Sequence, residues 1–318
     1  MPVSLVYGPV PSRRLGRSLG VNNIPPKICS YNCVYCQIGK TRMLEVNPRP
    51  FYEVDMISDH VQEKLGQAAM KGEKVDYITF VPDGETTLDI NLGAEIDMVK
   101  STGIPVAVIS NASLLWQQEV RQNLLNADWI SLKVDSVSEK NWQRIDRPHK
   151  SLRINDILDG ISGFARVYKG KLTTETMLVR GINDSPAEIE KITKFIAGLR
   201  PSVSYLAIPI RPPSEQIEAP DEAAVNQAYQ ILRQKIPYAE YLIGYEGDSF
   251  ASTGKVEEDL LSITSVHPMR QDAVIQFLQK TGSDWNIVAG MLDKYELVET
   301  EYRGDKFYMR KLPEHDSV

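Results

Sequence analysis

The pattern of apolar and polar positions predicts strands and helices that alternate along most of the chain. Short apolar runs of strand length recur, and between them apolar positions return at helical spacing. The predicted strands are 18–24, 75–81, 105–110, 129–134, 171–179 and 203–208. The predicted helices are 56–69, 89–101, 116–126, 137–146, 152–166, 186–199 and 221–234. Strand–helix units of this period indicate an α/β fold with a parallel sheet and right-handed crossovers. About six units, with polar residues at the strand ends, predict a partial or full βα barrel whose site lies at the carboxyl ends of the strands.

The rhythm changes after residue 254. Three short helices are predicted at 256–261, 270–281 and 285–294, followed by two strands around the turn Arg303-Gly304-Asp305. This order is the outline of a small winged-helix-like α+β domain over residues 256–318. We place the catalytic domain at 1–245 and a Gly/Ser/Asp-rich linker at 246–255.

Composition and charge restrict the partners. The 318 residues are 42% hydrophobic with a formal net charge of −6, which provides no general attraction for nucleic acid or anionic membrane. Apolar runs are of strand length, so no membrane span is expected. Residues 256–318 carry twelve acidic and seven basic side chains, so we expect this domain not to bind duplex DNA specifically. Removing it after Gly254 is expected to leave the basal chemistry of the barrel intact.

The three cysteines of the chain lie in one window, at Cys29, Cys33 and Cys36. An odd, clustered set forms no disulfide framework and fits a reducing cytoplasm. Three thiolates this close favour zinc or an iron–sulfur cluster. A fourth ligand is then a His, with His149 one candidate, or a carboxylate, or a small molecule on an open iron.

The CxxxCxxC spacing, with Tyr35 before the third cysteine, resembles the signature of the radical S-adenosylmethionine (SAM) superfamily. Asp83-Gly84-Glu85, after a predicted strand, resembles the GGE motif of the same superfamily. The resemblance covers about residues 5–245 and implies a partial (βα)6 TIM-like barrel. The opening Gly8-Pro-Val-Pro-Ser-Arg-Arg-Leu-Gly-Arg-Ser-Leu-Gly20 is similar to a group of stand-alone iron–sulfur oxidoreductases, loosely similar to the wybutosine tRNA-modification branch.

This resemblance implies two cofactors, a [4Fe–4S] cluster on the three cysteines and SAM on its fourth iron. A one-electron donor such as flavodoxin or ferredoxin reduces the cluster, and SAM is split to a 5′-deoxyadenosyl radical that takes a hydrogen from substrate. The implied cofactor-binding residues are Tyr35, Asp83, Gly84, Glu85, Ser110, Asn111, Lys133, Asp135 and Pro209. Candidate substrate contacts are Arg13, Arg14, Arg180 and Arg211.

Two other classes of protein remain open from the residues alone. One is a zinc-stabilised binding protein, and the other is a winged-helix regulator that uses a cluster as a sensor. The substrate of the enzyme is also open and includes RNA and protein, because fold and cofactor do not name it.

Overall fold

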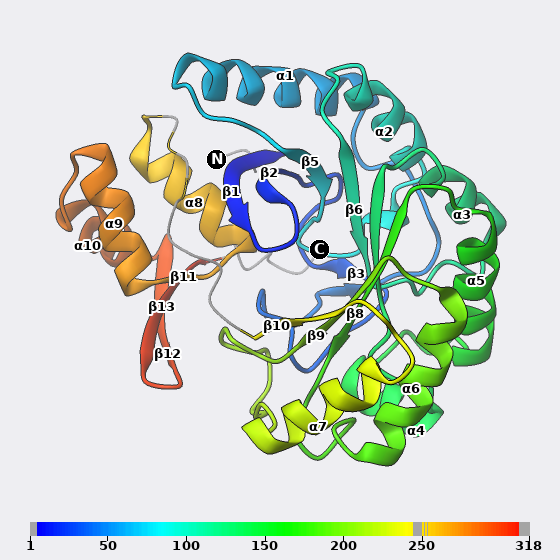
Figure 1. Cartoon of the computed structure of the whole chain (residues 1–318). Coiled ribbons are helices and arrows are strands. Elements are labelled where there is room, and N and C mark those ends of the chain that lie inside the picture. Colours follow the sequence, from blue (N-terminus) through cyan, green and yellow to red (C-terminus); the bar gives the residue numbers. More distant parts are fainter. Residues whose placement is uncertain (1–4, 244–249, 251, 253, 312–318) are drawn as a thin grey trace.

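A curled eight-stranded sheet forms the body of the protein (Figure 1). The computed structural model describes residues 5–243, 250, 252 and 254–311. Strand order is β1-β2-β5-β6-β7-β8-β9-β10; β1 is antiparallel to β2 and the remaining pairs are parallel. The strands are β1 Val6–Ser12, β2 Gly16–Val21, β5 Tyr77–Phe80, β6 Val106–Ser110, β7 Trp129–Lys133, β8 Lys171–Met177, β9 Val203–Ala207 and β10 Ala239–Leu242.

Helices cover the outer face of the sheet, and Figure 1 shows α1 to α7 on its convex side. Their apolar faces pack on the strands; Ile189, Ile192 and Ile196 of α6, at helical spacing, are fully buried. The helices are α1 Val54–Met70, α2 Leu92–Lys100, α3 Gln118–Leu124, α4 Glu139–Ile145, α5 Ile154–Val167, α6 Pro186–Leu199 and α7 Glu222–Arg233, with a 3₁₀ turn η1 at Thr86–Leu88. The predicted α/β half-barrel is therefore confirmed.

The sheet is larger than the predicted six-unit barrel. The hairpin β1–β2 opens it and β10 extends it at the other edge, and neither β1 nor β10 was predicted. Pro9 and Pro11 lie in β1, where the periodicity gave no strand signal. Proline is tolerated there because β1 is an edge strand and needs fewer ladder bonds.

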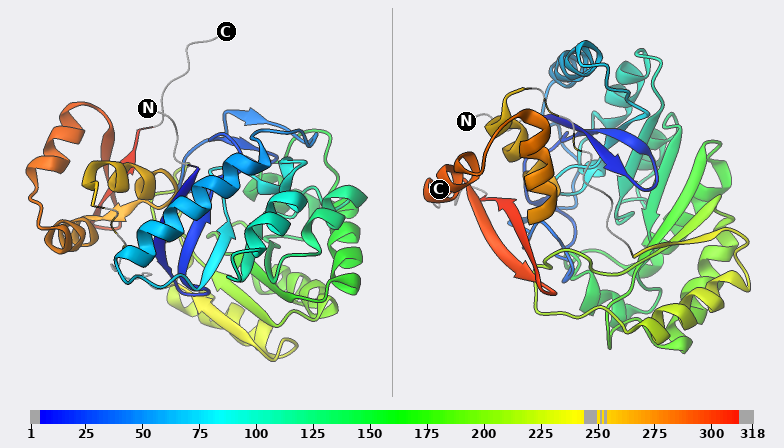
Figure 2. Two further views of the ribbon diagram at one scale, coloured as in Figure 1. Left: turned by 90° about the horizontal axis from the view of Figure 1, so that it is seen from above. Right: turned by 60° about the vertical axis from the view of Figure 1, so that its left-hand side comes forward.

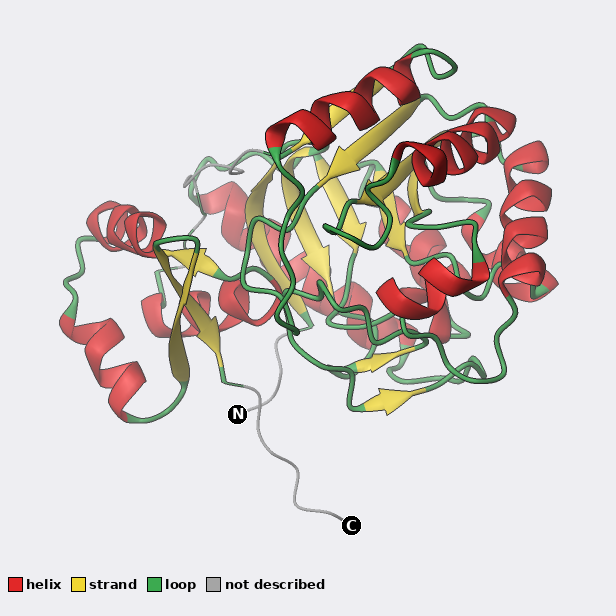
Figure 3. Cartoon of the chain, turned by 90° about the horizontal axis from the view of Figure 1, so that it is seen from below, coloured by secondary structure: helices red, strands yellow, loops and turns green. Residues whose placement is uncertain are grey.

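A second, two-stranded sheet lies outside the barrel. β3 Ile28–Cys29 and β4 Met43–Leu44 pair in parallel, with Cys29 opposite Leu44. Figures 2 and 3 show this pair at the periphery of the molecule. Cys29, the first iron ligand predicted from the sequence, thus lies on the strand that pairs directly with β4.

The C-terminal residues form a unit on the open side of the sheet (Figure 2). It contains α8 Val256–Val266, β11 Met269–Arg270, α9 Gln271–Thr281, α10 Asn286–Asp293, β12 Leu297–Tyr302 and β13 Asp305–Arg310. The predicted three helices and hairpin are present, with β11 added in the sheet order β11-β13-β12. The winged-helix assignment remains a prediction. Most of the predicted linker, 246–255, lies outside the described residues.

The C-terminal unit shares an apolar core with the barrel. Tyr7 and Val10 of β1 pack in one buried cluster with Leu260, Phe277 and other side chains of α8 to β13. In the described part of the chain, no helix has the length and apolarity that a membrane span requires.

Candidate active site

A cavity of about 280 Å³ lies inside the curled sheet, at the carboxyl ends of the strands. This volume is near the roughly 300 Å³ lower end of small-molecule pockets. Predicted site residues that line it are Arg13, Arg14, Tyr35, Cys36, Asp83, Lys133, Pro209 and Arg211. The sheet topology therefore brings together residues that are up to two hundred positions apart in the chain.

The cysteine loop, residues 29–36, is held by hydrogen bonds from two sides. Val34 N donates to Ile145 O, and Asn32 N donates to Asp146 O, at 2.9 and 3.0 Å. Ser214 Oγ donates to the carbonyls of Cys33 and Val34. The loop is thus clamped between the end of α4 and the segment after β9.

The donor set fits an iron–sulfur cluster. All three cysteines are free thiols, and Cys36 faces the cavity. Burial, with the nearby Glu85 carboxylate, raises the pKa of Cys29 to about 12, so a thiolate there needs the compensating positive charge that iron supplies. Among the described residues no three His, Cys, Asp or Glu side chains converge to hold a single metal ion. A cluster binds each thiolate on a different iron, so such convergence is not needed.

Gly84 fits closely against the first cysteine strand. A Cβ atom at this position would lie 2.0 Å from Ile28 O, and Glu85 N donates to the same carbonyl at 3.1 Å. Glycine is therefore required where the end of β5 touches the backbone beside Cys29.

The Glu85 carboxylate is occupied by protein donors. It is 1% exposed and accepts hydrogen bonds from Ser110 Oγ (2.7 Å), Asn111 N (2.8 Å) and the backbone and hydroxyl of Thr87. Asn111 Nδ2 in turn lies 3.5 Å from Cys29 Sγ. Glu85 and Ser110 therefore tie the ends of β5 and β6 together beneath the cysteine loop and do not line the cavity.

Asp83 and Lys27 carry charged atoms that have no hydrogen-bond partner in the described part of the chain. Both side chains are buried, at 1% and 5% exposure, and Asp83 lines the cavity. Burial raises the pKa of Asp83 to about 7, and the Lys27 ammonium opposes this rise. Buried charges without partners are costly, so this pair is suited to a ligand that carries both an amino group and a carboxylate.

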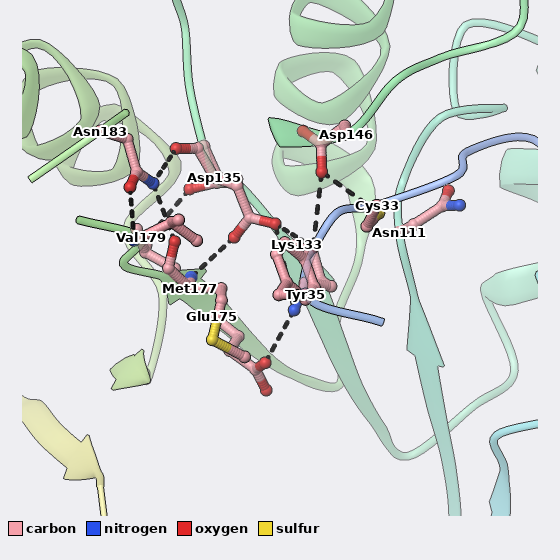
Figure 4. Close-up of polar contacts among 12 residues, drawn as sticks. Cys33, Tyr35, Asn111, Lys133, Asp135, Asp146, Glu175, Met177, Val179 and Asn183 are labelled. Atoms are coloured by element: carbon pink, nitrogen blue, oxygen red, sulfur yellow. Dashed lines mark hydrogen bonds and ion pairs between the residues drawn. The ribbon is translucent and has the colours of Figure 1, made fainter. Parts of the chain in front are cut away.

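A network of charged side chains crosses the floor of the cavity, and part of it is drawn in Figure 4. Lys133 Nζ lies 2.9 Å from Glu175 Oε1 and 4.0 Å from Asp135 Oδ2, and Tyr35 Oη donates to Asp135. Burial lowers the pKa of Lys133, but the two carboxylates outweigh this effect and raise it above its ordinary value. Arg14 pairs with Glu175, so the network links the β1–β2 hairpin to β7 and β8.

Arg180, a candidate substrate contact, is not among the residues that line this cavity. Its guanidinium pairs with Glu218 at 2.8 Å, and its side chain is 59% exposed. The position follows β8, but the chain turns outward there. His149, the candidate zinc ligand, shares a 2.8 Å hydrogen bond with Ser151 through Nδ1.

Three functional candidates were missed by the sequence reasoning: Lys27, Glu175 and Asp146. Asp146 Oδ1 accepts from Cys33 Sγ at 3.4 Å (Figure 4). Glu175 had a signal, because it alternates with Thr173 and Met177 on one face of a buried strand. Lys27 had only its place two residues before Cys29.

Comparison with known proteins identifies the class. The family model described as Radical SAM superfamily matches residues 23–196, and the chain belongs to this superfamily. Over 317 residues it is 44% identical to a UPF0026 protein of Methanocaldococcus jannaschii, covering 99% of this chain and 98% of that protein.

Solved structures show the same fold. A radical SAM methyltransferase from Sphaerobacter thermophilus has a TM-score of 0.54 and 16% identity, covering 71% of this chain and 66% of that one. TYW1 with a lysine–pyruvate adduct bound has a TM-score of 0.53 and 16% identity, covering 69% and 74%. At these identities the likeness concerns the fold.

Proposed function

We propose that this protein is a radical SAM enzyme that acts on an anionic substrate. The single observation that carries the proposal is the cysteine loop at the mouth of a half-barrel cavity, with Cys36 in the cavity wall. When bound, a [4Fe–4S] cluster supplies the electron that splits SAM into methionine and a 5′-deoxyadenosyl radical.

Cys29, Cys33 and Cys36 would hold the cluster. The end of α4 and the segment 214–217 fix the loop from outside, and Gly84 and Asn111 contact it from the strand ends. These contacts orient the three sulfur atoms before the cluster binds, which is what precise positioning of a radical reaction needs.

Asp83 and Lys27 would hold the methionyl end of SAM. The Asp83 carboxylate accepts from the amino group, and the Lys27 ammonium donates to the carboxylate. Glu85 acts through Asn111 as a positioning residue, because its own oxygens are already bonded. Tyr35, Lys133, Asp135 and Pro209 lie deeper in the cavity or around it and remain candidates for the rest of the cofactor.

Basic side chains in the cavity favour an anionic substrate group. Arg13, Arg14, Lys133 and Arg211 all line it. Arg14 also lies between the rings of Trp129 and Tyr205, 5.8 Å from each centroid, which fixes its direction. Such a group is a phosphate or a carboxylate, so RNA and protein substrates both fit the proposal.

Anaerobic reconstitution tests the function directly. The wild-type protein is expected to hold four irons and four sulfides and to release 5′-deoxyadenosine from SAM under reductant. Cys29→Ala, Cys33→Ala and Cys36→Ala are each expected to lose the cluster, because the chain has no spare thiol. A cysteine variant that keeps four irons and full SAM cleavage would contradict the proposal.

The alternative functions give different results in the same experiment. A zinc-stabilised binding protein would take up colourless zinc in preference to iron and sulfide. A cluster-based regulator would hold the cluster and produce no 5′-deoxyadenosine. Neither alternative is favoured by the arrangement of the described residues.

A further inference from the structure

We propose that the surface over the cysteine loop is the docking site for an acidic one-electron carrier protein. We call this surface the cluster-loop face and define it by residues 38–45 and 146–153. The inference rests on the proposed function, since the carrier would deliver the electron that the cluster needs.

Backbone contacts place both segments directly on the cysteine loop. From the first segment, Arg42 N donates to Lys27 O and Glu45 N donates to Cys29 O, both at 3.0 Å. From the second, His149 N donates to Ser30 O at 2.9 Å. The cluster-loop face therefore covers the loop on its outer side, and only Ile38, at the start of the first segment, lines the cavity on the inner side.

The centre of this face is apolar and exposed. Met43 and Leu44, which form β4, are 47% and 41% exposed. Leu44 pairs with Cys29 across a parallel ladder, whose strands are about 4.8 Å apart. A partner that contacts Leu44 is thus separated from the cluster ligand Cys29 by a single strand spacing, which is a short path for an electron.

The rim of this face is basic although the chain has a net charge of −6. Exposed basic side chains on the two segments are Lys40, Arg42, Arg147, Lys150 and Arg153. The acidic residues of the segments are Glu45 and Asp146. Asp146 is buried against Cys33, and the Glu45 carboxylate accepts from the backbone of Val46 and Asn47.

One further acid, Glu215, forms ion pairs with the rim, but the rim keeps a net positive charge. Glu215 lies 3.2 Å from Lys40 Nζ and 2.8 Å from Arg147 Nη1, so one carboxylate is shared by two cations. Arg42, Lys150 and Arg153 extend the positive charge on either side. A positive surface steers a negatively charged partner and speeds its association at low salt.

The chemistry of this face favours a protein over RNA. Its two segments contain no Phe, Tyr or Trp, and their one aromatic ring, that of His149, is tied to Ser151 by a hydrogen bond, so only arginine planes are left on which unpaired bases would stack. A small apolar centre with a charged rim is instead typical of the weak, transient contacts of electron-transfer proteins. In the step itself the carrier is oxidised by one electron and the cluster is reduced by one, and no proton is moved.

Stopped-flow reduction of the reconstituted protein tests the docking site. The probe is flavodoxin in its hydroquinone form, and the readout is bleaching of the cluster absorbance. Arg42→Glu with Lys150→Glu is expected to lower the second-order rate constant about tenfold at low salt, with the difference shrinking as salt is added. Leu44→Ser tests the apolar centre. Lys194→Glu on α6, an exposed site on another face, is the matched control and should reduce like the wild type.

A small reductant separates this inference from the proposed function. With titanium(III) citrate the charge-reversal variant should cleave SAM at the wild-type rate, since its cluster and cavity are unchanged. If the wild type yields no 5′-deoxyadenosine even then, the proposed function fails. If flavodoxin reduces the variant and the wild type equally fast, the docking site is overturned. Loss of tRNA binding in the variant, with an unchanged reduction rate, overturns it in favour of an RNA surface.

Discussion

Asp83 and Lys27 place two buried charged groups of opposite sign beside the cavity and the cysteine loop, where we propose that they bind the methionyl end of SAM. Lys27 N also donates to Asp83 O at 2.8 Å, so the backbones of the two residues are fixed to one another. Neither charged group meets a hydrogen-bond partner within the described residues. Two buried, unpaired charges of opposite sign are stabilised by a ligand that carries the complementary pair.

Substitution of either residue is expected to weaken SAM binding. Asp83→Asn and Lys27→Met should each raise the Kd for SAM by roughly ten- to a hundredfold, the effect of losing a charge-assisted hydrogen bond of about 1.5–3 kcal/mol. Decarboxylated SAM separates the two roles. Lys27→Met should bind it as well as the wild type does, whereas Asp83→Asn should still bind it more weakly. Equilibrium dialysis with the cluster-loaded protein measures both.

A control shows whether these effects are local. Asp59→Asn, on the exposed face of α1, should leave SAM affinity unchanged. Cluster content and absorbance verify that each variant is assembled. The ratio of the Kd for decarboxylated SAM to the Kd for SAM is the quantity to compare. If this ratio is the same in the wild type and in Lys27→Met, Lys27 does not contact the carboxylate.

Glu85 is expected to act on stability and on the cluster. Glu85→Ala leaves the donors of Ser110, Thr87 and Asn111 N without an acceptor, at a cost of about 1–3 kcal/mol for each buried donor left unsatisfied. Because Asn111 also contacts Cys29 Sγ, iron content should fall together with the urea midpoint. The sequence, which indicates Glu85 as a direct contact to SAM, predicts a different result for this variant: weaker SAM binding with the cluster intact. That result would contradict the positioning role.

The chemistry of single residues was predictable where a short motif carried it. The cysteines, Tyr35 and Asp83-Gly84-Glu85 stand in local patterns, and Lys133 and Asp135 follow from the ends of strands. Lys27 was not predictable, because a lone lysine in a loop is usually solvated. It is buried by tertiary contacts with Asp83 on one side and with the segment 39–43 on the other.

At the scale of elements, periodicity predicted the parallel strands that helices separate. It failed at the two edges of the sheet. β1 contains two prolines, and β10 has an exposed middle, so neither shows a continuous apolar run. The hairpin matters for the site, because it carries Arg13 and Arg14 into the cavity.

After the turn Asp83-Gly84-Glu85, two buried acids lie at the end of η1 and in α2, namely Asp89 and Glu95. Asn23 Nδ2 donates to Glu95 Oε2 at 3.2 Å and Asn23 Oδ1 accepts from Thr86 Oγ1 at 2.9 Å. Burial, with the neighbouring Asp89 carboxylate, raises the pKa of Glu95 to about 9, and burial raises that of Asp89 to about 6. Glu95 therefore keeps its proton in the fold at neutral pH.

This pair is expected to make stability depend on pH. A carboxyl group whose pKa is raised by folding stabilises the fold fully below its unfolded value, and this contribution is lost as pH rises towards 9. The free energy of unfolding should thus fall between pH 5 and 9. Glu95→Gln keeps the hydrogen bonds without the titration, so its slope should be shallower by up to about 1.4 kcal/mol per pH unit. Urea unfolding across this range measures the slope, and identical slopes would rule out a role for the pair.

At the scale of the whole molecule, the C-terminal unit is connected to the end of the cysteine loop. Arg211 Nη1 donates to Gln37, next to Cys36, at 2.8 Å, and Arg211 Nη2 lies 2.9 Å from His267 Nε2 at the end of α8. Tyr302 Oη of β12 donates to Pro209 O at 3.2 Å. The unit therefore reaches the residues that line the cavity, and it closes the open side of the half-barrel (Figure 2).

These contacts change what truncation is expected to do. The sequence suggested that removal of residues after Gly254 would leave SAM cleavage intact. In the structure, Tyr7 and Val10 of β1 are buried against the C-terminal unit, at 4% and 9% exposure. Exposing two such side chains costs about 3–6 kcal/mol, a large share of the 5–15 kcal/mol that stabilises a typical domain.

The truncated chain 1–254 is therefore expected to unfold at a markedly lower urea concentration than the full chain and to lose SAM cleavage with it. The cause is specific: β1 loses its cover, and β1 leads into the turn that carries Arg13 and Arg14. Val10→Thr should destabilise the full chain, where this side chain is buried, and should change the urea midpoint of the truncated chain much less, because the side chain is exposed there. Circular dichroism in urea and 5′-deoxyadenosine release measure the two effects. A truncated chain with the midpoint and the cleavage rate of the full protein would show that the half-barrel is an independent domain and that the shared core is dispensable.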